Sequence, residues 1–160
     1  MRYHMSPLGG LAALLLCLSG LLGETLAEVN SARGQTLYVP VYSEIPHGDR
    51  DHTLALTVTL SIRNIDRKVA VMVRKVDYYN AKGELVRAYA QEPRVLSPLA
   101  AIEVVIKASD RSGGISAGFV IEWESEHLCV PPAVEAVMIS TASTQGISFS
   151  SQARIVEEKR

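Results

Sequence analysis

The sequence has little excess charge of either sign. It carries 16 Lys and Arg against 17 Asp and Glu over 160 residues, which gives a formal net charge of -1 at pH 7. Such a balance produces no field strong enough to hold DNA, RNA or an acidic membrane surface by charge alone. We therefore expect no nucleic-acid partner. The rest of the composition, 48% hydrophobic and 21% charged, is typical of one globular domain and excludes a disordered tail or a collagen-like fibre.

The chain also lacks an apolar run long enough for a membrane span. The run from Leu8 to Leu22 has 15 residues, whereas a spanning helix needs about 20. An apolar run of this length near a positive N-terminus is typical of a signal peptide, and Thr25 and Ala27 are small residues suited to a signal peptidase. We expect residues 1–27 to be a signal peptide. Residues 28–160 would then be a single exported domain in the periplasm, with no membrane span after cleavage.

Cysteine is scarce as well. Cys17 lies in the predicted signal peptide, and lipid attachment at this residue is the alternative to release, although Leu16 stands where that signal prefers a small side chain. Cleavage would leave Cys129 alone, so no intrachain disulfide could form. Because Cys129 stands between Leu128 and Val130, we expect a small buried residue instead of a reactive thiol.

Alternation of apolar and polar residues dominates the mature chain, and no stretch keeps a helical period over three turns. The clearest strand pattern covers residues 54–64. Its inward face is expected to hold Leu54, Leu56, Val58, Leu60 and Ile62. Residues 69–79 alternate too, with a change of phase at Arg74 and Lys75 that predicts a β-bulge. The turn at residues 80–83 leads to a short strand at 84–89, which together predict a hairpin.

Five further strands are expected, at Thr36–Tyr42, Ala101–Ala108, Ala117–Ser125, Val134–Ser140 and Ile147–Val156. Their inward faces are expected to include Ile102, Val104, Ile106, Phe119, Ile121, Trp123, Ile147, Phe149 and Ile155. Pro40 cannot donate a ladder hydrogen bond, so we expect the first of these strands at a sheet edge. About eight short strands predict an all-β fold, an antiparallel two-sheet sandwich of immunoglobulin-like type. A small β-barrel is the alternative.

One serine lies in a pattern associated with hydrolysis. Residues 114–118 match the five-residue nucleophile elbow of hydrolases, with Ser116 at its centre. That elbow needs a buried strand before the serine and a helix after it, whereas here a polar turn precedes and a strand is expected to follow. We therefore favour a hairpin bend and expect no catalytic residue.

The densest group of metal-ligating residue types covers residues 47–52, and His127 and Cys129 lie far along the chain. His47 and His52 could converge across one loop, as zinc or copper would require. The spacing matches no compact ligand motif and Arg50 would oppose a cation, so we expect no metal and no cofactor.

Rigid sandwich strands present function through the loops that connect them. The most polar, glycine-containing loops are residues 43–53 and 110–116, and two tyrosines lie beside the first. The candidate ligand-binding residues are Tyr38, Tyr42, His47, Asp49, His52, Asp110, Gly113 and Gly114.

Several separated segments together resemble one bacterial family, known as domain of unknown function 3124. The segments are Gly34–Ser43, Leu60–Asn64, Asp77–Tyr79, the Gly113–Gly114 turn with Glu122–Trp123, and Gln145–Phe149. The resemblance covers nearly the whole mature chain. It implies a bacterial exported protein, and it brings no established activity, cofactor or catalytic residue with it.

Two classes of function stay open at this point. The first is a non-catalytic periplasmic binding or protein-interaction module for an unknown protein or small-molecule ligand in the cell envelope. The alternative is a metal-binding or hydrolytic envelope protein that uses the His47–His52 loop or Ser116. The positions of His127 and Cys129 discriminate between them, because a shared metal site needs these residues beside His47 and His52.

Overall fold

A computed structural model describes residues 30–48, 52–141 and 146–159 of the chain. The predicted signal peptide and Asp49 lie outside these described residues. The elements are strands apart from one short 3-10 turn, η1 (Gly114–Ser116). The strands are β1 (Ala32–Val41), β2 (Glu44–Pro46), β3 (Thr53–Ala55), β4 (Thr57–Arg63), β5 (Val71–Tyr79), β6 (Leu85–Ala88), β7 (Arg94–Leu96), β8 (Ala101–Ile106), β9 (Ala117–Cys129), β10 (Ala133–Ser140), β11 (Ile147–Gln152) and β12 (Arg154–Lys159).

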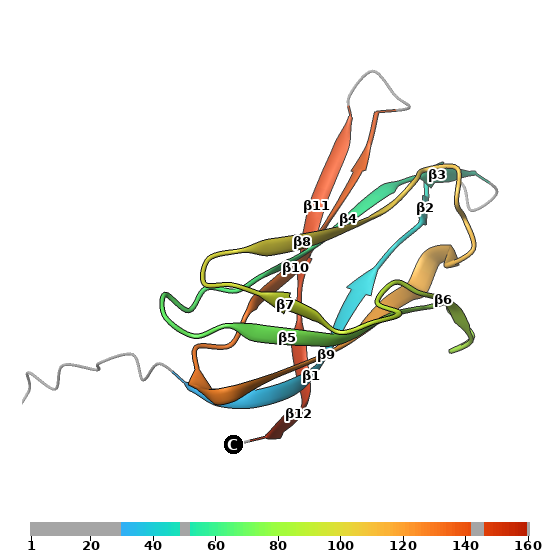
Figure 1. The fold of residues 1–160 in the computed structure, drawn as a ribbon. Helices are drawn as coiled ribbons and strands as arrows, with labels where there is room; N and C mark the ends of the chain where they lie inside the picture. Colours follow the sequence, from blue (N-terminus) through green and yellow to red (C-terminus); the bar gives the residue numbers. More distant parts are fainter. Residues whose placement is uncertain (1–29, 49–51, 142–145, 160) are drawn as a thin grey trace, which may run out of the picture.

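The strands form two antiparallel sheets packed face to face (Figure 1). A six-stranded sheet has the order β12-β1-β9-β5-β6, with β7 also paired to β5, and a four-stranded sheet has the order β11-β10-β4-β8. Strands β2 and β3 make a separate two-stranded hairpin. The predicted all-β sandwich is therefore confirmed. The described strands do not close into one continuous sheet, so the barrel alternative is wrong.

The core follows from the alternation of the sequence, because successive side chains of a strand point to opposite faces. In β4, Val58, Leu60 and Ile62 are buried, and in β9, Phe119 and Ile121 are buried against them from the other sheet. Cys129 at the end of β9 is also buried, as expected. Burial of these inward faces removes apolar surface from water and supplies the main stabilisation of the sandwich.

The predicted bulge and turn are both present. The pairing of β5 with β9 shifts register between Val73 and Lys75. The turn that follows β5 is closed by a 3.0 Å hydrogen bond from the Gly83 amide to the Asn80 carbonyl, and Gly83 has a φ of 78°. Glycine suits this position because a left-handed backbone costs it little.

Three expectations about strands are wrong. Strand β1 lies between β12 and β9 and not at an edge, and Pro40 is tolerated because the ladder to β12 ends at Tyr38. The segment 54–64 forms two strands, since Leu56 separates β3 from β4. The segment 147–156 also forms two strands, and it passes from one sheet to the other at Ala153, which leaves Ile155 58% exposed. Strands β2 and β7 were not predicted from the sequence, because three residues are too few to show an alternation of apolar and polar residues.

The two ends of the sandwich carry different loops. We call the end that holds the β1–β2, β5–β6 and β8–β9 connections the Ser43 end, and the end that holds the β4–β5, β7–β8 and β9–β10 connections the Asn64 end. Strand β9 runs from the first end to the second over 13 residues, which corresponds to about 40 Å.

Within the described residues, no helix is long and apolar enough to cross a bilayer.

Candidate functional site

The two loops singled out from the sequence meet at the Ser43 end. The Ser43 amide donates a 3.1 Å hydrogen bond to the Gly114 carbonyl. The Arg111 guanidinium lies 3.4 Å from the Glu44 carboxylate and 3.5 Å from the Thr53 hydroxyl. The β2–β3 hairpin and the β8–β9 loop are therefore joined through both backbone and side chains.

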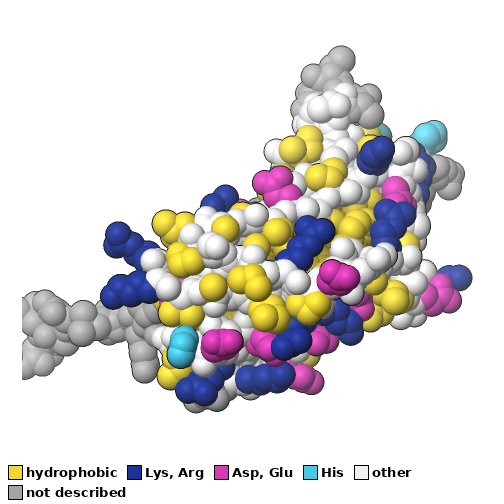
Figure 2. Space-filling model, in the orientation of Figure 1, with side chains coloured by type: hydrophobic (Ala, Val, Ile, Leu, Met, Phe, Trp, Pro, Cys, Tyr) yellow, Lys and Arg dark blue, Asp and Glu magenta, His cyan; other side chains and the backbone are white. Residues whose placement is uncertain are grey.

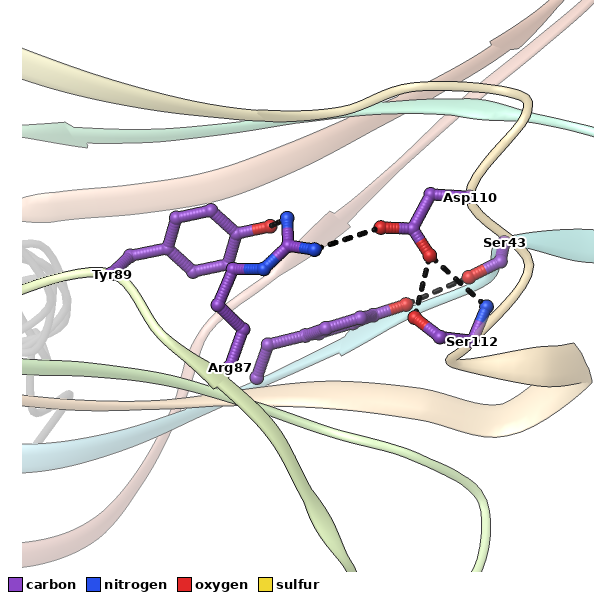
Figure 3. A network of polar contacts seen from close by, with 6 residues as sticks. Ser43, Arg87, Tyr89, Asp110 and Ser112 are labelled. Carbon is purple, nitrogen blue, oxygen red and sulfur yellow. Dashed lines mark hydrogen bonds and ion pairs between the residues drawn. The ribbon is translucent and has the colours of Figure 1, made fainter.

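A buried pair of hydroxyls lies beneath these loops (Figure 3). Ser43 Oγ and Tyr78 Oη are 2.7 Å apart, and both residues are buried. Burial raises the pKa of the Tyr78 hydroxyl, so it stays protonated and able to donate at neutral pH. Neither Ser43 nor Tyr78 was among the candidates, because nothing in the sequence brings β1 and β5 to the same point.

The two candidate glycines have different roles beside this pair. A Cβ at Gly113 would lie 1.8 Å from Tyr78 Oη, so this position needs glycine for space. Gly114 has a φ of 71° and open space around it, so it needs glycine for its left-handed backbone. Both glycines therefore determine the conformation of the loop, and neither has a side chain that could contact a ligand.

Asp110 links this loop to strand β6. Its carboxylate accepts hydrogen bonds from the Ser112 hydroxyl at 2.5 Å and from the Ser112 amide at 3.1 Å, and these bonds hold its pKa below the usual value. Arg87 Nη2 lies 3.6 Å from the other carboxylate oxygen. The same guanidinium donates to Tyr89 Oη at 3.2 Å and lies 5.5 Å from the centre of the Tyr89 ring (Figure 3).

A pocket of about 290 Å³ lies beside this network. It is lined by Arg87, Val105, Lys107, Ser109 and Asp110. Two of these side chains are cationic and one is anionic, so the pocket favours a ligand with a negative group. Of these residues only Asp110 was predicted from the sequence, because Arg87 in β6 and Lys107 after β8 share no local pattern and meet only across the two sheets.

The two candidate tyrosines are packed against the protein and make no contact with the network among the interactions of the described residues. Tyr38 is 37% exposed and its ring covers Gly118, where an added Cβ would lie 2.4 Å from the ring. Tyr42 packs edge-to-face on Phe149, with ring centres 5.9 Å apart. Both tyrosines support the sheets, as aromatic residues of strands ordinarily do.

The candidate metal ligands are divided between the ends. His47 and His52 face each other across the β2–β3 hairpin, where the His47 amide donates to the His52 carbonyl at 2.8 Å. His127 and Cys129 lie at the far end of β9, so they share no site with the two histidines. Burial also raises the pKa of the Cys129 thiol, which disfavours the thiolate that metals bind. No group of three His, Cys, Asp or Glu suited to a metal is found among the residues that the structure describes.

Ser116 does not lie in the geometry of a nucleophile elbow. It ends η1, is exposed and is followed directly by β9, so the order is loop, 3-10 turn, strand. A hydrolase elbow has the order strand, turn, helix.

A second depression, of about 500 Å³, lies on the outer face of the six-stranded sheet near the Asn64 end. Met72, Val95 and His127 are among its lining residues, and Arg74 and Glu124 form an ion pair at its side. Its lining mixes both charges with apolar groups, and no sequence motif indicated it.

The crystal structure of Thermotoga maritima 1070 is similar to this chain, with a TM-score of 0.46 and 17% sequence identity, over 81% of this chain and 99% of that one. No curated protein matches the chain. A family model described as "Protein of unknown function (DUF3124)" matches residues 34–156, which confirms the resemblance found in the sequence. The chain therefore belongs to this family of proteins of unknown function.

Proposed function

We propose that the protein is a non-catalytic binding module of the periplasm that recognises a protein or small-molecule ligand of the cell envelope through its Ser43 end. One observation supports the proposal most directly: the β1–β2, β5–β6 and β8–β9 connections are bonded to one another and form one surface. Hydrogen bonds join the Gly113–Gly114 turn to Ser43 at 3.1 Å and to Ala81 at 3.2 Å. Loops held on a rigid sandwich in this way are a common site of recognition.

Charged side chains give this surface its means of recognition. Arg87 and Lys107 line the pocket, and Glu44 pairs with Arg111 between the β2–β3 hairpin and the β8–β9 loop. Charged groups of this kind select partners by complementarity and steer their approach. Export rests on the apolar run and the small residues before position 28, which mass measurement of the mature protein tests. An intact N-terminus, or a lipid on Cys17, would contradict release after Ala27.

Capture of envelope components on the immobilised protein tests the binding surface. The double variant Glu44→Ala with Arg111→Ala removes this ion pair and leaves the core unchanged. Arg63→Ala is the matched control, because it removes an exposed arginine contact at the Asn64 end. We expect the double variant to lose a component that the unmodified protein and the control retain. Equal capture by all three proteins would overturn the proposal for this surface.

One observation keeps a metal site within the β2–β3 hairpin open as the alternative, the backbone bond that holds His47 opposite His52, although His127 and Cys129 lie at the other end of the sandwich. Changing His47, Asp49 and His52 together to alanine tests it. A folded triple variant that still retains zinc or copper would end this alternative, and a variant that loses a metal held by the unmodified protein would favour it over the binding module.

A further inference from the structure

One side of the sandwich is open and the other is closed. On the closed side, β11 and β12 are separated only by Ala153, so the chain itself connects the two sheets there. On the open side, β8 borders the four-stranded sheet and pairs only with β4, while β6 and β7 border the other sheet (Figure 1). Edge strands of this kind present unpaired backbone groups that can bind another strand.

The edge at β8 lacks the features that protect the other edges. Strand β12 carries four charged residues among its six, β11 is rich in serine, and β6 and β7 are only four and three residues long. Strand β8 has six residues, Ala-Ile-Glu-Val-Val-Ile, of which one is charged and none is proline. Charge protects β12 and short length protects β6 and β7, and β11 lies on the closed side, where Ala153 leads the chain into the other sheet. Strand β8 is therefore the least protected edge on the open side of the described sheets.

The direction of the β8 amides follows from one hydrogen bond. The Asn64 amide donates to the Ala100 carbonyl at 2.9 Å, immediately before the β4–β8 ladder begins. Bonded residues alternate along an antiparallel strand, so Ile102, Val104 and Ile106 direct their backbone groups to β4. The backbone groups of Ala101, Glu103 and Val105 then point outward.

The surface around this edge is apolar. Ile102 and Val104 are only partly buried against the core, and Val105 is 53% exposed. Leu99, in the turn that leads into β8, is 57% exposed. Figure 2 shows hydrophobic side chains gathered on the face that carries β7 and β8. A strand added at β8 would cover the partly exposed sides of Ile102 and Val104 and remove them from water.

We propose that β8 binds an extended peptide segment of another protein by strand addition, with an acidic side chain of that peptide in the pocket at the end of β8. The backbone of Glu103 and Val105 pairs with the peptide, and aliphatic peptide side chains pack on Ile102 and Val104. Lys107 follows β8 directly and lines the pocket with Arg87, so the cationic groups lie where the added strand ends. Backbone pairing gives affinity in this mode and side-chain pockets give specificity.

A second copy of this chain fits the edge less well. In an antiparallel β8–β8 pair centred on Glu103, two carboxylates lie opposite each other and Leu99 of one copy lies opposite Lys107 of the other. In a pair centred on Val104, Ala101 lies opposite Lys107. A pair centred on Val105 does bring Glu103 opposite Lys107, but it pairs only residues 104–106 of each β8. No register therefore combines a full ladder with an acidic residue at the pocket, so we favour a peptide from a different protein.

Defined peptides test the proposal. The probes are end-blocked heptapeptides that alternate valine and threonine and carry glutamate at either the first or the last position, so that antiparallel and parallel addition are both covered. The control peptides carry lysine in place of glutamate. Binding is measured by fluorescence anisotropy. We expect one glutamate peptide to bind, and its lysine counterpart to bind about tenfold more weakly, which corresponds to one charge contact.

Matched protein variants locate the binding. Val105→Pro removes one outward amide and leaves the β4 ladder intact, whereas Val105→Thr keeps that amide. We expect Val105→Pro to abolish binding and Val105→Thr to retain it. Lys107→Ala is expected to weaken binding of the glutamate peptide about fivefold and not to weaken binding of the lysine peptide, because it removes a like charge from that peptide's site. Since Val105→Pro could fail to fold, hydrogen exchange gives an independent readout: the peptide should slow exchange at Glu103 and Val105 but not at Val104, which is already paired.

Three outcomes would overturn the proposal. They are no binding of either glutamate peptide, binding that persists in a folded Val105→Pro variant, and exchange protection that does not alternate along β8. A wild-type dimer that Val105→Pro converts to monomer, without peptide binding, would assign the edge to a second copy and overturn it too. The inference rests on the proposed function only in that both describe a binding module. If neither glutamate peptide binds, and the Glu44→Ala, Arg111→Ala variant still loses capture of an envelope component, the β8 site is rejected and the proposed function is retained.

Discussion

The two ends of the sandwich are held together by different kinds of polar contact. At the Asn64 end, side chains bind backbone groups of neighbouring loops. At the Ser43 end, side chains also bind other side chains, as in the Ser43–Tyr78 and Arg87–Asp110 pairs. The first arrangement closes loops whose buried backbone groups need partners, and the second leaves charged groups near the surface.

Asn64 and Asp66 organise the first end. The fully buried Asn64 amide nitrogen lies 2.9, 3.1 and 3.2 Å from the carbonyls of Val69, Leu96 and Ser97. Asp66 accepts hydrogen bonds from the amides of Lys68, Val69 and Val130 at 2.8 to 3.0 Å. Two adjacent side chains thus connect all three loops of this end, and their polar groups are used within the fold. The Asn64 end therefore contributes to stability, while the Ser43 end has charged groups near the surface that a partner could bind.

The largest expected effect is at Asn64. Asn64→Ala removes the side-chain partner of the buried Leu96 carbonyl and of the part-buried Val69 carbonyl, whereas the Ser97 carbonyl keeps a bond from the Ala100 amide. We expect the free energy of unfolding to fall by about 2–4 kcal/mol. Urea unfolding measures this change. Asn80→Ala, which removes a similar turn-forming side chain at an exposed site, is the control and should cost about 1 kcal/mol. Similar losses in both variants would mean that burial does not distinguish the Asn64 end.

The next effect is steric and lies at the other end. Gly113→Ala places a methyl group where Tyr78 Oη now lies, which forces the loop or the ring to shift and should cost about 1–3 kcal/mol. Tyr78→Phe in the same chain should recover part of this loss, because the first atom in the way is the hydroxyl. Ser112→Ala is the control that changes the same loop without the clash. No recovery in the double variant would show that the ring carbon or Ala117 sets the limit instead.

A smaller effect measures the buried hydroxyl pair. Ser43→Ala and Tyr78→Phe each remove one partner of the 2.7 Å contact and should cost about 1–2 kcal/mol. In the Ser43→Ala variant the remaining Tyr78 hydroxyl is left without its partner, so the double variant should cost less than the sum of the two. Urea unfolding of the four proteins gives the coupling energy. Additive costs would show that the two hydroxyls do not depend on each other.

Acid should lower the stability of the fold through one carboxylate at each end, Asp66 at the Asn64 end and Asp110 at the Ser43 end. Backbone amides, first that of Val130, lower the pKa of Asp66 from its usual 3.8, and Ser112 lowers that of Asp110. A lowered pKa in the folded state gives stability that is present above 3.8 and is lost as pH falls through the folded value. We expect Asp66→Asn and Asp110→Asn each to flatten the acid limb of stability against pH, measured by urea midpoints. An unchanged limb in either variant would contradict the lowered pKa at that residue.

The sequence predicted much of the fold because alternation records which face of a strand is buried. The patterns at Val58, Leu60 and Ile62 and the bulge near Lys75 needed only local information. The position of β1 did not follow from Pro40, since whether a strand is at an edge depends on partners that come from elsewhere in the chain. For the same reason the sequence indicated the polar loops of the candidate site but not Arg87, Lys107 or Tyr78, whose meeting depends on how the two sheets are packed.

The smallest effect on stability is expected at Arg111, where an effect on binding can be measured separately from an effect on stability. The Arg111–Glu44 pair is 3.4 Å apart, and the arginine side chain is 54% exposed, so solvent screens it and Arg111→Ala should cost about 0.5 kcal/mol or less. Arg63→Ala at the Asn64 end removes a comparable exposed contact, a 3.0 Å bond to the Leu99 carbonyl, and should be similarly mild. If the Ser43 end is the binding surface, only the first substitution lowers capture of an envelope component while both proteins unfold at nearly the same urea concentration. Loss of capture in both variants would remove the functional distinction between the two ends, because it would make the arginine at either end equally important for binding.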